Sequence, residues 1–114
     1  MKNKLFLALL LFLLSGVASA SIYCTGKVDN VYVANNGDVV FKAKWRNDWT
    51  RACNIKDVDT VKCSLWASYL LTAVKDNLNI TVQYNSANNQ TCASLPTYSN
   101  TPTPGYIMVI NPTL

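Results

Sequence analysis

The sequence predicts a small, mainly β protein: a five-stranded barrel with one helix and two disulfides, in the order β-β-β-α-β-β. Three observations predict it. Apolar and polar residues alternate along most of the chain, the period changes once to that of an amphipathic helix, and the four cysteines follow a signal peptide. The length of 114 residues suits one domain.

Residues 1–20 have the features of a secretory signal peptide. Lysines near the start are followed by an uninterrupted apolar run from Leu5 to Leu14 and by an Ala-Ser-Ala cleavage motif that ends at Ala20. The run is too short to cross a bilayer. We therefore expect cleavage after Ala20 to leave a secreted or periplasmic chain, residues 21–114, that is not embedded in a membrane.

The first three predicted strands precede the helix. Ile22–Ala34 has strand composition, but its apolar positions change parity at Asp29-Asn30, which predicts a bulge in one long bent strand. Asn35-Asn36-Gly37-Asp38 predicts a hairpin turn, because Asn-Gly is the strongest short hairpin signal. Val39–Arg46 shows the clearest alternation of the chain, and Thr50–Ile55 is long enough for a short third strand.

The predicted helix covers Ser64–Asp76, where apolar residues recur at helical spacing. Asp59, Thr60 and Ser64 are all possible N-caps, and the pattern does not choose between them. Asn77 followed by Leu78 predicts a left-handed end to the helix.

Two more strands complete the predicted domain. Ile80–Tyr84 alternates, and Tyr106–Ile110 is apolar throughout. A long bent first strand, a hairpin, and one helix between the third and fourth strands is the arrangement of the OB barrel. We therefore expect residues 21–114 to form a single OB-like barrel, although a small β-sandwich or a sheet with one packed helix fits nearly as well.

The even number of cysteines in a short exported chain predicts a disulfide framework. In an OB barrel the first strand lies beside the fourth, which brings Cys24 towards Cys92. Cys53 likewise ends the third strand near Cys63 at the helix start. We favour these two pairs among the three possible connectivities. A zinc site would need all four thiolates, and no close C-x-x-C pair is present, so we expect neither a metal nor a cofactor.

An exported chain of this length with this strand order, a helix after the third strand and few disulfides resembles the B subunits of bacterial pentameric AB toxins. The resemblance covers most of residues 21–114 as topology, and no receptor-binding motif of that family is found in the sequence. It implies a ring-forming, glycan-binding subunit whose helices line a central pore.

Composition excludes several kinds of chemistry. The chain has no His and no Glu, so neither a Ser-His-Asp nor a Cys-His site can be built, and a carboxylate pair has only Asp to use. In residues 21–114, eight Lys and Arg against six Asp leave a net charge of +2, which argues against nucleic-acid binding. We therefore expect a protein that is not an enzyme.

Two groups of side chains are candidate ligand contacts. Asn47-Asp48 predicts a turn after the second strand, and four side chains surround it: Trp45, Arg46, Trp49 and Arg51. An exposed Trp beside Arg can stack on a sugar or anchor a partner. The alternative is that Trp45 completes the apolar face of the second strand and Trp49 caps the end of the barrel. The second group lies in or beside the Pro-rich connection between the last two strands: Tyr98, Asn100, Thr101, Thr103 and Tyr106. The alternative is that this connection is only a surface loop held by a disulfide.

Two further features have a plain structural alternative. Asp57 and Asp59 form the only conceivable acid/base or cation pair, but a solvated turn before the helix explains them better. The strand Tyr106–Ile110 is apolar on both faces, so it is either a contact between copies in a homo-oligomer or covered by the helix or the long connection.

These observations predict a non-enzymatic, exported binding module. Twelve Asn, ten Thr and six Tyr in residues 21–114 suit a neutral, hydrogen-bonding ligand, so we expect a carbohydrate or a protein, bound at the barrel end formed by the turns and the long connection. The alternative is a monomeric periplasmic inhibitor or accessory protein of an envelope enzyme or complex.

Overall fold

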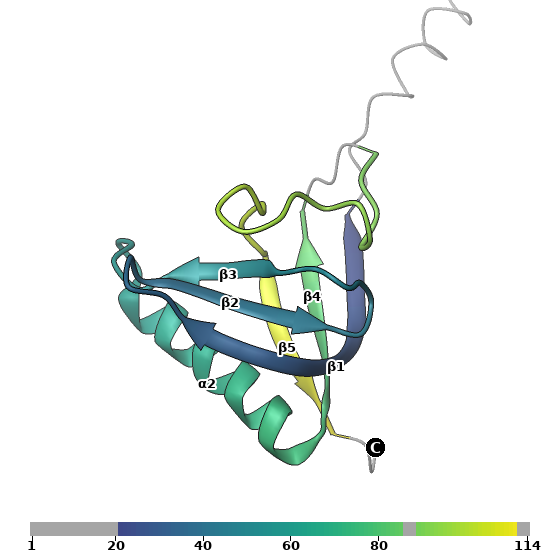
Figure 1. Ribbon diagram of the computed structural model, residues 1–114, viewed down its shortest axis with the longest axis horizontal. Helices are drawn as coiled ribbons and strands as arrows, with labels where there is room; N and C mark the ends of the chain where they lie inside the picture. Colours follow the sequence, from purple (N-terminus) through teal and green to yellow (C-terminus); the bar gives the residue numbers. More distant parts are fainter. Residues whose placement is uncertain (1–20, 86–88, 112–114) are drawn as a thin grey trace, which may run out of the picture.

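A computed structural model describes residues 21–85 and 89–111 (Figure 1). The predicted signal peptide lies outside these residues. The observed order of elements is the predicted one: β1 (Ile22–Val33), β2 (Asp38–Ala43), β3 (Thr50–Asn54), α2 (Thr60–Asp76), β4 (Asn79–Tyr84) and β5 (Tyr106–Ile110). All strand pairs in the sheet are antiparallel, and the strand order is β3-β2-β1-β4-β5.

β1 belongs to both halves of the sheet. Its first half pairs with β4, from Ile22 to Lys27, and its second half pairs with β2. The register shifts between Val28 and Asn30, so the predicted bulge at Asp29 is confirmed. The strand bends at this point, as Figure 1 shows. The bend turns one strand into the shared edge of two three-stranded halves.

The sheet is not the closed barrel that the sequence predicted. β3 and β5 are its two edges and do not pair with each other. Instead, Thr50 at the start of β3 forms an isolated parallel bridge with Tyr98, and the amide of Tyr98 donates to the carbonyl of Trp49 (3.3 Å). The connection before β5 therefore lies where the last strand would have to pair to close a barrel.

α2 packs against the curved sheet and contacts all five strands, chiefly β1, β3 and β5. Asp59 is the N-cap, since its side chain accepts from the amide of Lys62 (3.1 Å), and Asn77 ends the helix in the left-handed region with φ 55°. The helix begins earlier than the apolar pattern predicted because its first turn is mostly exposed. Its buried side chains complete the core together with those of the strands: Cys63, Trp66, Leu70 and Ala73.

Both predicted disulfides are confirmed. Cys24–Cys92 joins β1 to the connection between β4 and β5, and Cys53–Cys63 joins β3 to the first turn of α2. Two disulfides and no free cysteine are consistent with an oxidising, exported environment. Within residues 21–85 and 89–111, no helix has the length and apolar character needed to span a membrane.

Candidate functional site

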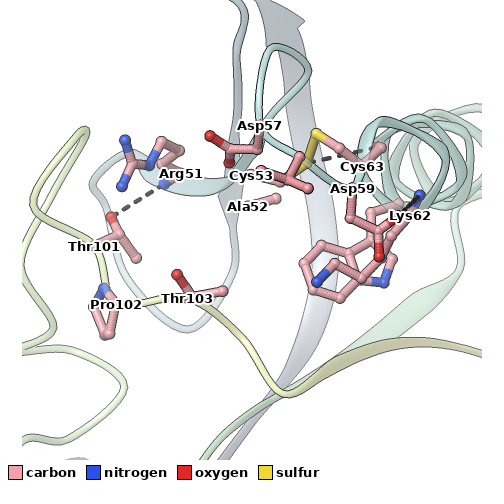
Figure 2. A pocket seen from close by; sticks show the side chains of 12 residues that line it. Arg51, Ala52, Cys53, Asp57, Asp59, Lys62, Cys63, Thr101, Pro102 and Thr103 are labelled. Atoms are coloured by element: carbon pink, nitrogen blue, oxygen red, sulfur yellow. Dashed lines mark hydrogen bonds between the residues drawn. A yellow bond between two sulfur atoms is a disulfide. The ribbon is translucent and has the colours of Figure 1, made fainter.

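A cleft of about 370 Å³ lies between β3, the segment that leads into α2, the first turns of α2, and residues 101–103 (Figure 2). Its volume falls in the range of small-molecule sites, roughly 300–1,000 Å³. The cleft follows the edge of β3 that no other strand of the sheet covers. The failure of the barrel to close is therefore what leaves room for a site here.

The two sides of the cleft come from distant parts of the sequence. Thr101, Pro102 and Thr103 form one side, and Asp59 and Lys62 lie on the other, next to the disulfide (Figure 2). The lining between them is largely apolar, and its side chains are held by the core: Ala52, Cys53, Cys63 and Trp66. The hollow thus combines an apolar base with polar sides.

Two cations and two carboxylates line the cleft, so its charged groups balance. Asp57 accepts from the amide of Asn54 (3.3 Å) through one oxygen, and Asp59 uses one oxygen as the helix N-cap. The second oxygen of each carboxylate has no hydrogen-bond partner among the residues that the structure describes. The cleft therefore has no net charge of its own, and it offers hydrogen-bond acceptors to a ligand.

The cations supply the matching donors. The Arg51 guanidinium lies 3.5 Å from a carboxylate oxygen of Asp38. The Lys62 ammonium lies 5.1 Å from the ring centroid of Trp66, which is a cation–π distance. Neither cation forms a bidentate ion pair with a carboxylate, so both have N–H groups that can donate to a ligand.

The structure brings together only part of the predicted site. Arg51, Thr101 and Thr103 meet in the cleft, joined there by the aspartate pair that sequence analysis treated as a solvated turn. Arg51 and Thr101 are also linked directly, because the amide of Arg51 donates to the hydroxyl of Thr101 (3.1 Å).

The other predicted contacts lie elsewhere. Trp45 packs edge-to-face on Phe41 at 5.8 Å, and Trp49 packs edge-to-face on the exposed Tyr32 at 5.2 Å, so each ring has an aromatic partner in the same chain. Arg46 is buried and hydrogen-bonded. None of these three lines the cleft.

Tyr98 and Tyr106 are 47% and 41% exposed and also lie outside the cleft. Strand register places Tyr106 in one row with Gln83 and the exposed Tyr23, on the outer face of the sheet. Gln83 is buried in the middle of this row and donates to Asn85 (2.8 Å). We call Tyr23, Gln83 and Tyr106 the tyrosine row: two exposed tyrosines on either side of a buried glutamine.

Two residues of the cleft, Lys62 and Trp66, were not among the predicted ligand contacts. The helical pattern assigned Trp66 to the core, and it is indeed only 6% exposed. Lys62 preceded the predicted helix start, so the two were not seen as a pair. With the helix beginning at Thr60, they are four positions apart on one helix face, a spacing that brings side chains together.

No group of three or more potential metal ligands of the His, Cys, Asp or Glu type occurs in the described part of the chain. Comparison of the sequence with protein-family models and curated proteins, and of the structure with solved structures, gives no match.

Proposed function

We propose that the mature chain is an exported, non-enzymatic binding module that holds a carbohydrate in the cleft beside β3. The observation that carries the proposal is the cleft itself, with balanced donors and acceptors around an apolar base that includes Trp66. Sugar hydroxyls both donate and accept hydrogen bonds, and the carbon faces of a sugar ring suit an apolar, aromatic surface. The lack of His and Glu in the sequence supports a binding role over catalysis.

A glycan array probed with the oxidised mature protein tests this function. We expect retention on a subset of glycans, weakened about tenfold or more by Asp57→Asn or Thr103→Ala. The first replaces a charged acceptor by a neutral amide donor, and the second removes a hydroxyl. Asp76→Asn makes the same chemical change at the far end of α2 and should not alter binding.

Two outcomes would contradict the proposal that the carbohydrate binds in the cleft. Loss of binding on Tyr106→Ala, with Asp57→Asn unaffected, would place the ligand on the tyrosine row. An array without retention, together with specific capture of an envelope protein, would instead support the inhibitor or accessory role.

We further propose that copies of the chain associate head to tail. Besides the edge of β3 that borders the cleft, β5 and the second half of β1 have no backbone partner on one side among the described residues. Both are uncharged over Val31–Val33 and Tyr106–Ile110, and each borders an apolar groove beside α2. Unpaired apolar edges favour strand addition, and joining two different edges generates a ring when the rotation closes.

Light scattering behind a sizing column tests this assembly. We expect a mass several times that of the monomer, which is roughly 10 kDa at about 110 Da per residue. Met108→Lys disables the β5 edge and Val33→Lys the β1 edge, so either variant alone should be monomeric. Val61→Lys, an exposed helix position outside both grooves, is the control.

Mixing the two edge variants gives the sharpest result. Each retains the edge that the other has lost, so the mixture should form a heterodimer but nothing larger. An interface built from two identical edges would leave one variant fully assembled and would refute the head-to-tail arrangement.

We also propose that the fold is an open form of the OB arrangement. A bent β1 between β2 and β4, with the helix after β3, supports an open, OB-like arrangement. This order, the two disulfides and the free strand edges together support the resemblance to ring-forming toxin B subunits.

A further inference from the structure

Arg46 is a buried cation, 9% exposed, that makes no ion pair with a carboxylate among the described residues. Its guanidinium instead donates to neutral acceptors. These are the hydroxyl of Thr50 (Nη2–Oγ1 2.6 Å) and the backbone carbonyls of Trp49, Leu95 and Pro96. Burial lowers the pKa of the guanidinium.

Removing a cation from water without a carboxylate partner is unfavourable, so other interactions must stabilise the buried guanidinium. The acceptors provide one, because they belong to two segments. Trp49 and Thr50 lie where the turn after β2 meets the start of β3, whereas Leu95 and Pro96 lie 49 and 50 residues after Arg46. A planar fork of five donors can hold such a set together, which a lysine or an apolar side chain cannot do.

The contacts continue from Arg46 to the cleft. The hydroxyl of Thr101 shares its proton between the carbonyls of Pro96 (3.0 Å) and Tyr98 (2.9 Å), and it accepts from the amide of Arg51 (3.1 Å). Thr101 is the first of the three residues, 101–103, that form one side of the cleft. Arg46 is thus two hydrogen bonds away from a residue of the cleft, although it does not line the cleft itself.

We propose that Arg46 is a positioning residue: its guanidinium fixes residues 95–101 against β3 and thereby places the 101–103 side of the cleft. That a ligand contacts this side rests on the proposed function, whereas the restraint on the segment does not. The interaction is reported by the amides of Tyr98 and Thr101, which donate to the carbonyls of Trp49 and Tyr98.

Amide hydrogen exchange of the oxidised mature protein tests the restraint without any ligand. In Arg46→Ala, we expect exchange at Tyr98 and Thr101 to rise about tenfold or more, while amides within α2 and between β1 and β4 keep their protection. Lys44→Ala removes the same charge in the same turn, where the side chain is exposed, and should exchange like the wild type.

Chemical rescue separates positioning from a general loss of stability. Millimolar methylguanidinium should restore protection at Tyr98 and Thr101 in Arg46→Ala, and an equal concentration of sodium chloride should not. If Arg46→Ala does not fold, Thr101→Val breaks the same path further along and should release residues 97–103 alone. Unchanged exchange in the segment, or an equal rise throughout the chain, would overturn the proposal.

Binding to the glycan array, measured on the same variants, keeps the two proposals distinct. Increased exchange with weakened glycan retention, both restored by methylguanidinium, supports both. Increased exchange with no effect on retained glycans supports the restraint and contradicts the cleft as the binding site.

Discussion

Thr50 of β3 lies in a parallel bridge with Tyr98, and this pairing covers the edge of β3 where a closed barrel would need its last strand. The bridge is short, and beyond it the edge of β3 opens into the cleft. The edge of β3 is therefore paired at its first residue and faces the cleft over the residues that follow.

Tyr98 has a backbone φ of 50°, in the left-handed region that non-glycine residues rarely occupy. We expect Tyr98→Val to destabilise the protein by about 1–2 kcal/mol, because a β-branched residue tolerates this region poorly. Tyr98→Asn should stay close to the wild type, since Asn is enriched there. Guanidinium denaturation measures both, and equal stability of the Val and Asn variants would contradict the argument.

The sequence predicted the elements well because they depend on local signals. The hairpin at Asn36-Gly37 is confirmed, with Gly37 at φ 93°, and the bulge in β1 follows from the change of parity. Cys24–Cys92 was predicted from the neighbour relation of β1 and β4, which the structure has. Cys53–Cys63 was predicted because Cys53 ends the third strand near the start of the helix.

The open sheet and most of the cleft could not be predicted in this way. Whether β3 pairs with β5 or with Tyr98 depends on where a long connection folds, and no periodic pattern describes such a segment. Arginine is usually found at the surface, whereas Arg46 is buried because its guanidinium donates to the carbonyls of Leu95 and Pro96, far along the chain. Non-local hydrogen bonds of this kind leave no signal in local sequence.

The two disulfides should differ in their effect on stability. In the chain-entropy model, Cys53→Ser/Cys63→Ser opens a short loop and costs roughly 3 kcal/mol, whereas Cys24→Ser/Cys92→Ser opens a long loop and costs roughly 4 kcal/mol. Denaturation midpoints of the two double variants measure this order. A larger loss from the short loop would indicate that contacts of β3 with α2, rather than chain entropy, dominate.

Asn77 should be important for the end of α2. It is left-handed, with φ 55°, and the amide of Leu78 donates back to the carbonyl of Ala73 (2.9 Å). Asn77→Gly should preserve or slightly raise the melting temperature, and Asn77→Ala should cost about 1 kcal/mol. Asp76→Ala, one residue earlier and helical, serves as the control. If Ala and Gly at position 77 were equivalent, the left-handed conformation would not limit stability.

Tyr84 should make the protein sensitive to alkali. It is 1% exposed, and its hydroxyl has no hydrogen-bond partner among the described residues. Burial raises the pKa of this hydroxyl above its usual value near 10, although the positive charge of Arg46 acts in the opposite direction. Below pH 10 both the folded and the unfolded chain keep the proton, so stability does not change there on account of this group.

Above pH 10 the unfolded chain releases the Tyr84 proton and the folded chain retains it, so the free energy of unfolding falls. The slope is up to about 1.4 kcal/mol per pH unit until the folded state ionises as well. Tyr84→Phe removes this dependence and also an unpaired buried hydroxyl, so the variant should match or exceed the wild type in stability at pH 8. Denaturant titrations of both proteins from pH 8 to about 11 measure the difference. Parallel curves would show that Tyr84 does not carry the alkaline transition.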